Sequence, residues 1–530
     1  MILFNGYFWT VDSKNPVAEA VAIRGNHILA VGDSALVFRL RANHTKTINL
    51  EGRFACPGFN DSHMHLLQGA KELDEVDFSD VHSFREMQNL ILKTVRHLPP
   101  GAWLVGKGWD QNHLTDELWP DYRVLDAVAP HVPMFLMRSC GHVVLVNNKA
   151  LNIAGIDNET PNPPGGIIER DRRGRATGIL KEEAIQLVRQ YLPAQETRQI
   201  KENLRTLIAQ IPQYGITSIQ DCSGSETIRL YSDLFSKSGL PCRLSESFEL
   251  SGDMETVREY QHNIKLPLMR FGLLKGSVDG NVGSRTAAFF EPYADNRDCR
   301  GLAIISQEEL NQQVVLADAH GYQIGIHAIG DLATHMALNA FELAQGINGK
   351  KERRHRIEHA QVIAPSDFHR FKDLNMVVSM QPAHCIEDLR WIDLSIGRER
   401  CRYAYAWRSL YESGNTLAFG SDWPYATMNP LVGIYAAATR RDETGFPLQG
   451  WIPKERLSVE AAIEAYTLGA AYAEYAEKEK GSLEAGKFAD IVILDRNLLK
   501  ITPEEILTTS VVCTILDGSV VYQQDTFECP

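Results

Sequence analysis

Two histidines, His63 and His65, stand two positions apart in the stretch of residues 56–66. On an extended strand, side chains at this spacing point to the same face, so a strand that runs into this stretch would aim both imidazoles into one space. Two converging imidazoles are half of a transition-metal site. Such a pair also occurs by chance on strand edges, so the metal interpretation depends on whether the chain supplies further ligands.

Short apolar runs between residues 51 and 479 end in polar residues and alternate with helical patterns, which is typical of βα units around a parallel sheet. The eight runs cover residues 54–65, 215–221, 242–249, 269–279, 323–328, 355–360, 376–381 and 416–422. Eight strands are what a (β/α)8 TIM-type barrel requires, and active sites of such barrels lie at the carboxyl ends of the strands. The polar residues at those ends are His63, His65, Lys275, Asp279, His327, Glu358, His359, Gln381, His384 and Asp422. The ordered histidines with Asp422 predict a hydrolytic metal site in an α/β barrel.

Both ends of the chain are rich in short β segments. Residues 1–50 contain a strand, a Gly-Asn turn and a second strand, and residues 480–530 have the same texture. We expect these two segments to pair into one small β-sandwich domain. The segment from about residue 68 to residue 195 is too long for a simple crossover between the first two barrel strands, which indicates an insertion near the active-site mouth. Within it, we expect two strands around a polar turn at residues 165–180. The insertion is either a substrate-recognition element or a structural buttress.

The overall composition excludes several classes of protein. With 530 residues and a net charge of -13, the chain has no basic footprint, so neither nucleic acid nor an anionic membrane surface is an expected partner. The first residues lack the pattern of a signal peptide, and no apolar run reaches the roughly 18 residues of a membrane span. Nine cysteines without a Cys-x-x-Cys pair indicate neither a disulfide framework nor a zinc ribbon. We therefore expect a cytoplasmic protein with reduced cysteines.

Six strings together resemble the amidohydrolase superfamily, in particular amidohydrolase family 3 and the branch that includes N-substituted formamide deformylases. They are residues 57–66, 327–331, 357–361, 379–384, 420–424 and 481–490. The resemblance runs nearly end to end. It implies a distorted barrel whose metal centre hydrolyses an amide-type C–N bond, and the habit of the family implies a homodimer.

The resemblance also assigns metal ligands. It makes His63, His65 and Asp422 the ligands of one ion, and His327 and His359 the ligands of a second. Lys275 is the candidate for a lysine that carbon dioxide carboxylates to bridge the two, although the following Gly276 is unusual and an ordinary ion-paired lysine is the alternative. One or two divalent ions are expected. Zinc is our first expectation, while manganese, iron, cobalt and nickel accept the same ligand types.

The chemistry follows from these ligands. A divalent ion lowers the pKa of bound water to about 7 and polarises the carbonyl under attack. Asp422 would take the proton of the attacking water and deliver it to the departing amine, which leaves poorly unless it is protonated. Candidate substrate residues are Trp109, His142, Asp279, Arg285 and His384. Each has a structural alternative. Trp109 could equally be a packing residue, and His142 and His384 could each make a structural hydrogen bond in the core. Asp279 and Arg285 could anchor the loop after the fourth strand.

The expected activity is hydrolysis of a small amide, either an N-substituted formamide or an N-acyl amine. The same ligand set is compatible with deamination of a ring amine or opening of a cyclic amide. A non-catalytic regulatory protein that keeps the fold is a third hypothesis, which the intact ligand set disfavours. Fold alone does not decide between reactions, so the substrate class depends on the resemblance.

Overall fold

A computed structural model describes the chain at residues 1–115, 119–250, 253–525 and 527. Its centre is an eight-stranded parallel sheet that curls into a barrel, in the order β21-β20-β19-β18-β17-β16-β15-β8. The strands are β8 (Phe59–Met64), β15 (Ile216–Asp221), β16 (Arg243–Glu249), β17 (Met269–Ser277), β18 (Ile324–Ala328), β19 (Arg356–His359), β20 (Val377–Met380) and β21 (Thr416–Phe419). Each of the eight apolar runs contains one of these strands, so the expected barrel is confirmed.

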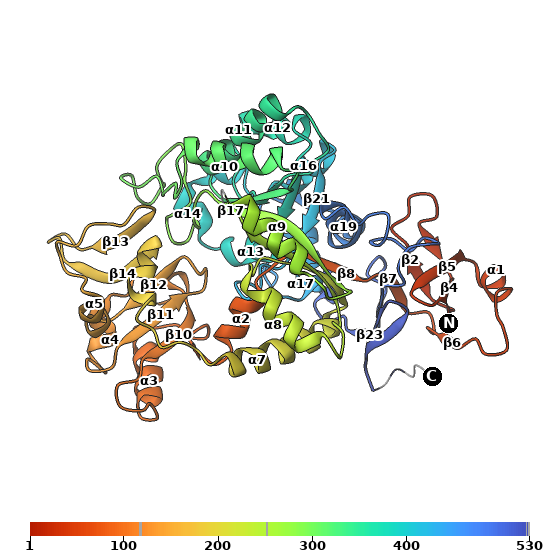
Figure 1. Ribbon diagram of the computed structural model, residues 1–530, viewed down its shortest axis with the longest axis horizontal. Helices are drawn as coiled ribbons and strands as arrows, with labels where there is room; N and C mark the ends of the chain where they lie inside the picture. The colour runs from red at the N-terminus through yellow and green to blue at the C-terminus, as the bar shows by residue number, and fades with distance from the viewer. Residues whose placement is uncertain (116–118, 251–252, 526, 528–530) are drawn as a thin grey trace.

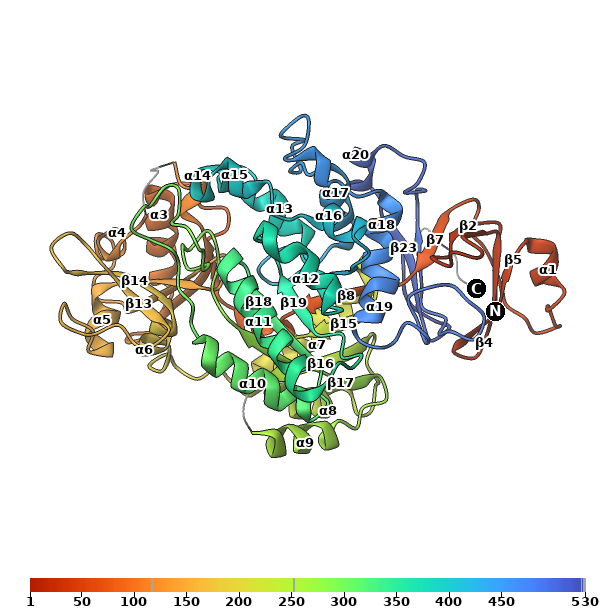
Figure 2. The ribbon, with the colours of Figure 1, turned by 90° about the horizontal axis from the view of Figure 1, so that it is seen from above.

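Helices surround the barrel and cover its outer face (Figures 1 and 2). They bury apolar side chains against the strands, as α11 does with Ala333, Ala337 and Phe341. Outside the terminal sheets and the inserted segment, the described helices are α2 (Leu66–Glu72), α7 (Thr197–Gln210), α8 (Glu226–Phe235), α9 (Met254–Asn263), α10 (Gln307–Ala319), α11 (Asp331–Asn348), α12 (Phe368–Asp373), α13 (Pro382–Asp388), α14 (Ile392–Ile396), α15 (Arg398–Cys401), α16 (Trp407–Glu412), α17 (Pro430–Thr439), α18 (Val459–Glu464), α19 (Ala470–Ala473) and α20 (Pro503–Ile506), and α13 and α14 lie toward the insertion rather than on the outer face. Within the described ranges, no helix combines the length and the apolar character needed to cross a membrane.

The two ends of the chain meet in a pair of sheets at one side of the barrel (Figure 1). One sheet has the order β5 (His27–Gly32), β4 (Ala20–Arg24), β1 (Ile2–Phe4), β6 (Thr47–Asn49), with α1 (Ser34–Phe38) beside it. The other has the order β24 (Ser519–Gln523), β23 (Val511–Leu516), β22 (Ile491–Leu494), β7 (Phe54–Pro57), β2 (Tyr7–Trp9), β3 (Val17–Ala18). Leu3 and Val21 of the first sheet share a buried core with Ile491 and Cys513 of the second. The expected sandwich of both termini is confirmed.

The first apolar run, residues 54–65, differs from its expected form because the structure divides it between two sheets. Its first part, β7, pairs with β22 in the sandwich, and only the second part, β8, enters the barrel. The change occurs at Pro57 and Gly58. Proline brings no N–H to a ladder, and a Cβ on Gly58 would stand 2.3 Å from the side chain of Thr217.

The inserted segment forms a six-stranded sheet of its own, in the order β13-β14-β12-β11-β10-β9. Its strands are β9 (Val76–Asp77), β10 (Leu104–Trp109), β11 (Met134–Arg138), β12 (Val143–Val146), β13 (Gly166–Arg170) and β14 (Ala176–Glu182), and its helices are α3 (Phe84–Val95), α4 (Tyr122–Asp126), α5 (Asn148–Ala154) and α6 (Gln186–Arg189). The hairpin of β13 and β14 matches the two strands expected at 165–180. The insertion lies at the end of the molecule opposite the terminal sheets (Figures 1 and 2).

Candidate metal centre

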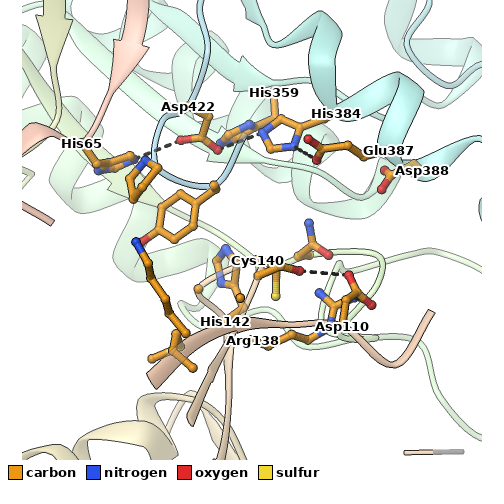
Figure 3. Close-up of a pocket in the computed structure, with 18 of the residues that line it drawn as sticks. His65, Asp110, Arg138, Cys140, His142, His359, His384, Glu387, Asp388 and Asp422 are labelled. Carbon is orange, nitrogen blue, oxygen red and sulfur yellow. Dashed lines mark hydrogen bonds and ion pairs between the residues drawn. The ribbon is translucent and has the colours of Figure 1, made fainter. Parts of the chain in front are cut away.

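A cavity of about 540 Å³ separates the carboxyl ends of the barrel strands from the inserted sheet. The barrel contributes one wall and the insertion the other (Figure 3). The barrel residues include His63, His65, Lys275, His327, His359, His384 and Asp422, and the insertion residues include Lys107, Asp110, Arg138, Ser139, Cys140 and His142. The cavity therefore collects most of the polar residues that the strand ends predicted.

His63, His65 and Asp422 meet where the first and last barrel strands close the sheet. Oδ1 of Asp422 lies 3.4 Å from Nε2 of His63 and 3.2 Å from Nε2 of His65. The backbone fixes this arrangement, because Asp422 N–H donates to the carbonyl of His63 at 2.7 Å and His65 N–H donates to the carbonyl of Trp423 at 2.8 Å. The three side chains offer ligand atoms that all lie within 4.8 Å of one another.

Asp422 also belongs to a second cluster, with His359 and His384. Its Oδ2 lies 3.1 Å from Nε2 of His384. Burial opposes the charge of Asp422, but the hydrogen bond with His384 and the proximity of His65 and the other imidazoles hold its pKa well below the usual range. Burial likewise opposes the charge of His384, whose pKa the Asp422 carboxylate raises to about 10. Asp422 is therefore an ionised carboxylate between two groups of imidazoles.

The side-chain atoms around Asp422 are suited to bind a metal ion. Nε2 of His63, Nδ1 of His359 and Oδ1 of Asp422 are buried and make no hydrogen bond, whereas buried polar atoms are nearly always paired. Burial lowers the pKa of His63 and of His359, so both imidazoles are neutral and keep a lone pair for a cation. Imidazole nitrogens with a carboxylate oxygen are the ligands of zinc and similar ions.

His327 and Lys275 line the same cavity but stand outside these two clusters. Nε2 of His327 lies 3.1 Å from the carbonyl oxygen of Gly280, and its ring is 4.5 Å from that of His359. His359 is thus grouped with Asp422 and His384, whereas the expected partner of His359 was His327. The roles of His327 and Lys275 as ligands stay predictions.

Comparison with known proteins places this architecture in a family. A model of the Amidohydrolase family matches residues 46–522. The chain belongs to the amidohydrolase family. The expectation from the six strings is confirmed.

Individual relatives cover nearly the whole chain. It is 33% identical over 536 residues to Protein LONG AFTER FAR-RED 3 of Arabidopsis thaliana, an alignment that covers 98% of this chain and 91% of that one. It is 28% identical to N-substituted formamide deformylase of Arthrobacter pascens, with 99% and 98% covered. Among solved structures it is similar to an uncharacterized metal-dependent hydrolase from Pyrococcus furiosus, with a TM-score of 0.71, 30% identity, and 94% and 99% covered.

The substrate residues expected for this amidohydrolase divide into two groups. His142 and His384 line the cavity. Trp109 does not, because its fully buried ring packs in the core of the insertion and its indole N–H donates to the carbonyl of Leu136 at 2.7 Å. The next residue, Asp110, faces the cavity in its place, where it pairs with Arg138 at 2.7 Å. The expected substrate contact of Trp109 is corrected to packing.

Asp279 and Arg285 lie outside the cavity lining and organise the loop after β17. The carboxylate of Asp279 accepts backbone N–H groups of Ala288, Ile329 and Gly330 at 2.8, 3.0 and 2.8 Å. Burial raises its pKa to about 7 in spite of these bonds. Arg285 pairs with Asp295, which lies in the same loop, at 3.0 Å. Their expected contact with substrate is replaced by loop anchoring, the alternative named for both.

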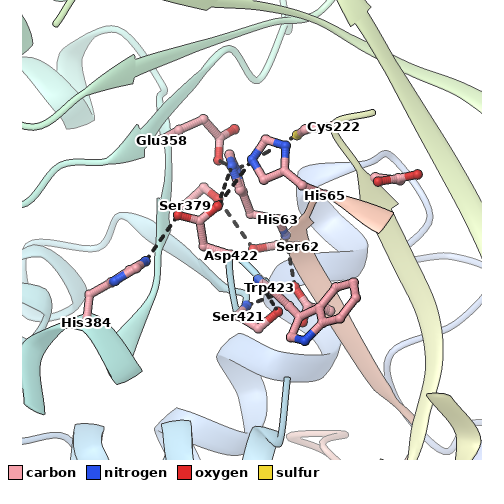
Figure 4. Close-up of polar contacts among 12 residues, drawn as sticks. Ser62, His63, His65, Cys222, Glu358, Ser379, His384, Ser421, Asp422 and Trp423 are labelled. Carbon is pink, nitrogen blue, oxygen red and sulfur yellow. Dashed lines mark hydrogen bonds and ion pairs between the residues drawn. The ribbon is translucent and has the colours of Figure 1, made fainter. Parts of the chain in front are cut away.

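Two buried glutamates of the site were not in the set assigned from the sequence. Glu358, at the end of β19, accepts from Nδ1 of His63 at 2.7 Å (Figure 4). It also pairs with Arg356. Glu182, at the end of β14, accepts from Nδ1 of His142 at 2.9 Å. Burial disfavours the charge of His142, but Glu182 raises its pKa to about 9. Glu358 was visible as a polar strand end next to His359, while Glu182 carried no signal of this kind.

Proposed function

We propose that this protein hydrolyses a non-peptide C–N bond of a small amide, an N-substituted formamide or an N-acyl amine. As a member of the amidohydrolase family with a His/His/Asp cluster, it is a metal-dependent hydrolase. The observation that carries the proposal is that potential metal-ligating atoms of His63, His359 and Asp422 are buried in the cavity without a hydrogen-bond partner. The formamide deformylase similar to this chain supports the substrate class.

His63, His65 and Asp422 would hold one divalent ion, for which we propose zinc, and His327 and His359 would hold a second. When bound, such an ion supplies Lewis acidity, which makes water more acidic and a carbonyl more electrophilic. Carboxylation of Lys275, a homodimer, a cytoplasmic location and the lack of a nucleic-acid partner stay predictions.

Asp422 is the residue that moves the proton in this proposal. Its carboxylate is ionised in the folded protein, so it accepts a proton from the attacking water. It then donates that proton to the amine nitrogen as the C–N bond breaks. His384 holds Oδ2 of the carboxylate at 3.1 Å and keeps it oriented toward the cavity during both transfers.

The cavity limits the size of the substrate. Its volume of about 540 Å³ lies within the range of roughly 300–1,000 Å³ typical of small-molecule sites. The wall supplied by the insertion faces the reacting groups, which narrows the site and limits its contact with bulk water. A small amide fits this space, whereas an extended polymer does not.

A substrate screen tests the proposal. Metal-loaded protein is offered N-formyl amines, N-acyl amines, cyclic amides and aminated rings, and the products are identified by mass spectrometry. We expect formate or another carboxylate with a free amine. If the protein only releases ammonia from the aminated rings, it is a deaminase, and if it only opens the cyclic amides, it is a cyclic amidohydrolase. Either result would contradict the proposed reaction.

The variant Asp422→Asn tests the role of the carboxylate. We expect kcat to fall by a factor on the order of 10² to 10⁴, because the amide cannot carry the proton. Far-ultraviolet circular dichroism reports on the fold. Asp233→Asn, at a half-exposed carboxylate that pairs with Lys201, is the matched control and should keep full activity. Full activity of Asp422→Asn would remove Asp422 from the mechanism.

A further inference from the structure

Glu182 combines three features that no role in the inserted sheet requires. Its backbone has φ 51° and ψ -128°, a conformation that residues other than glycine rarely adopt. Its side chain is only 7% exposed, although it carries a carboxylate. That carboxylate faces the cavity wall, where Oε2 accepts from Nδ1 of His142 at 2.9 Å. A strained backbone of this kind costs about 1–3 kcal/mol and persists only when its surroundings hold it in place.

The surroundings of Glu182 come from both halves of the cavity. On the insertion side, its backbone N–H donates to the carbonyl of His142 at 3.1 Å, so the two residues are joined twice. On the barrel side, its Oε1 lies against Gly280, since a Cβ built on Gly280 would stand 1.9 Å from that oxygen. The carbonyl of Gly280 in turn lies 3.1 Å from Nε2 of His327. The carboxylate is thus wedged between the insertion and the loop that follows β17.

His142, the partner of Glu182, lies where it can contact a bound substrate. Its imidazole lines the cavity, 25% exposed, and its ring lies 5.4 Å from that of His327. Figure 3 shows it on the wall opposite His65 and Asp422. Because Glu182 holds Nδ1, the nitrogen left for a bound molecule is Nε2. A carboxylate behind an imidazole fixes the orientation of the ring and the nitrogen that faces the substrate.

We propose that Glu182 is a positioning residue that holds Nε2 of His142 against the amide group of the substrate, across the cavity from Asp422. The inference rests on the proposed hydrolysis for its substrate and extends the active site to the inserted sheet. His142 is then a catalytic residue contributed by the insertion, and Glu182 acts only through it. The insertion is accordingly part of the active site rather than a buttress.

A double-mutant cycle tests this coupling. His142→Ala should lower kcat/KM by a factor on the order of 10² to 10³, as for the loss of one hydrogen-bond donor to the reacting group. Glu182→Gln keeps the shape of the side chain and should lower kcat by about 10- to 100-fold with little change in KM, as for other outer partners of a catalytic group. The double variant should match His142→Ala alone, because Glu182 has no other route to the reaction.

Glu169→Gln is the matched control. Glu169 lies on β13, the other strand of the same hairpin, and its half-exposed carboxylate pairs with Lys181 at 3.0 Å. This variant should retain the kcat of the unaltered protein, and all four variants should keep its metal content and melting temperature. Losses that multiply in the double variant, or an unchanged kcat in Glu182→Gln, would overturn the proposal.

A measurement without turnover separates this inference from the proposed function. In metal-loaded protein labelled with ¹⁵N-histidine, the proton on Nδ1 of His142 should give a downfield NMR signal that disappears in His142→Gln and shifts upfield in Glu182→Gln. If no amide is hydrolysed but this signal behaves as expected, the substrate assignment fails and the positioning stands. If the signal does not respond to Glu182→Gln, the positioning fails whatever the substrate is, and Gly280→Ala, which displaces Oε1, provides the same test should Glu182→Gln not fold.

Discussion

The orientation of His63 is set by a carboxylate behind it. Glu358 lies 2.7 Å from Nδ1 of His63, and both side chains are 1% exposed. Burial opposes the charge of Glu358, but Arg356 and then His63 lower its pKa. The imidazole therefore donates a hydrogen bond from Nδ1–H to the ionised carboxylate, which leaves Nε2 free to face the cavity. At this scale the sequence predicted the ligand types but not the partners behind them.

Glu358→Gln should weaken metal binding by about 10- to 100-fold, since an outer partner of a ligating histidine raises its basicity and fixes its ring. Competition with a chromogenic chelator measures the affinity. The control is Glu342→Gln, a change at a largely exposed carboxylate that pairs with Arg370. An affinity equal to that of the control would show that His63 is oriented by other contacts.

Neighbouring residues explain why some assignments from the sequence were wrong. Trp109 and Asp110 are adjacent at the end of β10, yet one is packed in the core and the other faces the cavity. The chain pattern marked this position as chemically interesting, but it could not decide which side chain faces which way. That choice depends on the core of the insertion, where Trp109 packs against side chains from several strands and helices that are separated from it in the chain.

At the scale of the elements, the metal centre depends on how closely β8 approaches β21. Asp61 bridges the two strands, because its Oδ1 accepts from the N–H of His63 at 3.1 Å and of Ser421 at 3.0 Å. Gly420 makes this approach possible, since a Cβ there would stand 2.5 Å from the backbone nitrogen of His63. The strands themselves were predictable from apolar runs. The division of the first run at Gly58 was not, because it depends on pairing with β22 from the far end of the chain.

Gly420→Ala should therefore lower the free energy of unfolding by about 1–3 kcal/mol, the usual cost of overpacking, and reduce metal content because His63 is displaced. Urea unfolding and elemental analysis measure the two effects. Gly346→Ala is the control, because a Cβ at that position of α11 meets nothing within 4 Å. It should stabilise the helix by about 0.5–1 kcal/mol. Similar stabilities of the two variants would contradict the account of barrel closure.

At the scale of the whole molecule, a buried ion pair joins the barrel to the terminal sandwich. Arg243, at the start of β16, lies 2.7 Å from Asp490 and also pairs with Asp517, and its guanidinium stacks 3.8 Å from the ring of Phe488. Thr514 adds a hydrogen bond to the carbonyl of Pro212 at 2.7 Å. The sequence predicted a sandwich built from both ends, but it gave no indication of this interface. The sandwich and barrel should unfold together.

Arg243→Ala should lower the free energy of unfolding by about 3–5 kcal/mol, because it leaves the carboxylate of Asp490, 4% exposed, without its cation. Differential scanning calorimetry measures the change and the number of transitions. Arg198→Ala removes an exposed pair with Glu202 and should change stability by no more than about 0.5 kcal/mol. Two separate transitions in the unaltered protein would show that the sandwich folds independently of the barrel.

The division of the first apolar run at Gly58 has a consequence for biosynthesis. Pro57 in β7 is paired with Ile491 in β22, so the ribosome must add more than 400 residues before this strand receives its second neighbour. At about 5–20 residues per second, the wait is on the order of 20 to 90 s. During that time β7 presents an unpaired edge, which other nascent chains can join. The strand that leads into His63 and His65 is thus among the first to be synthesised and among the last to have both of its edges paired.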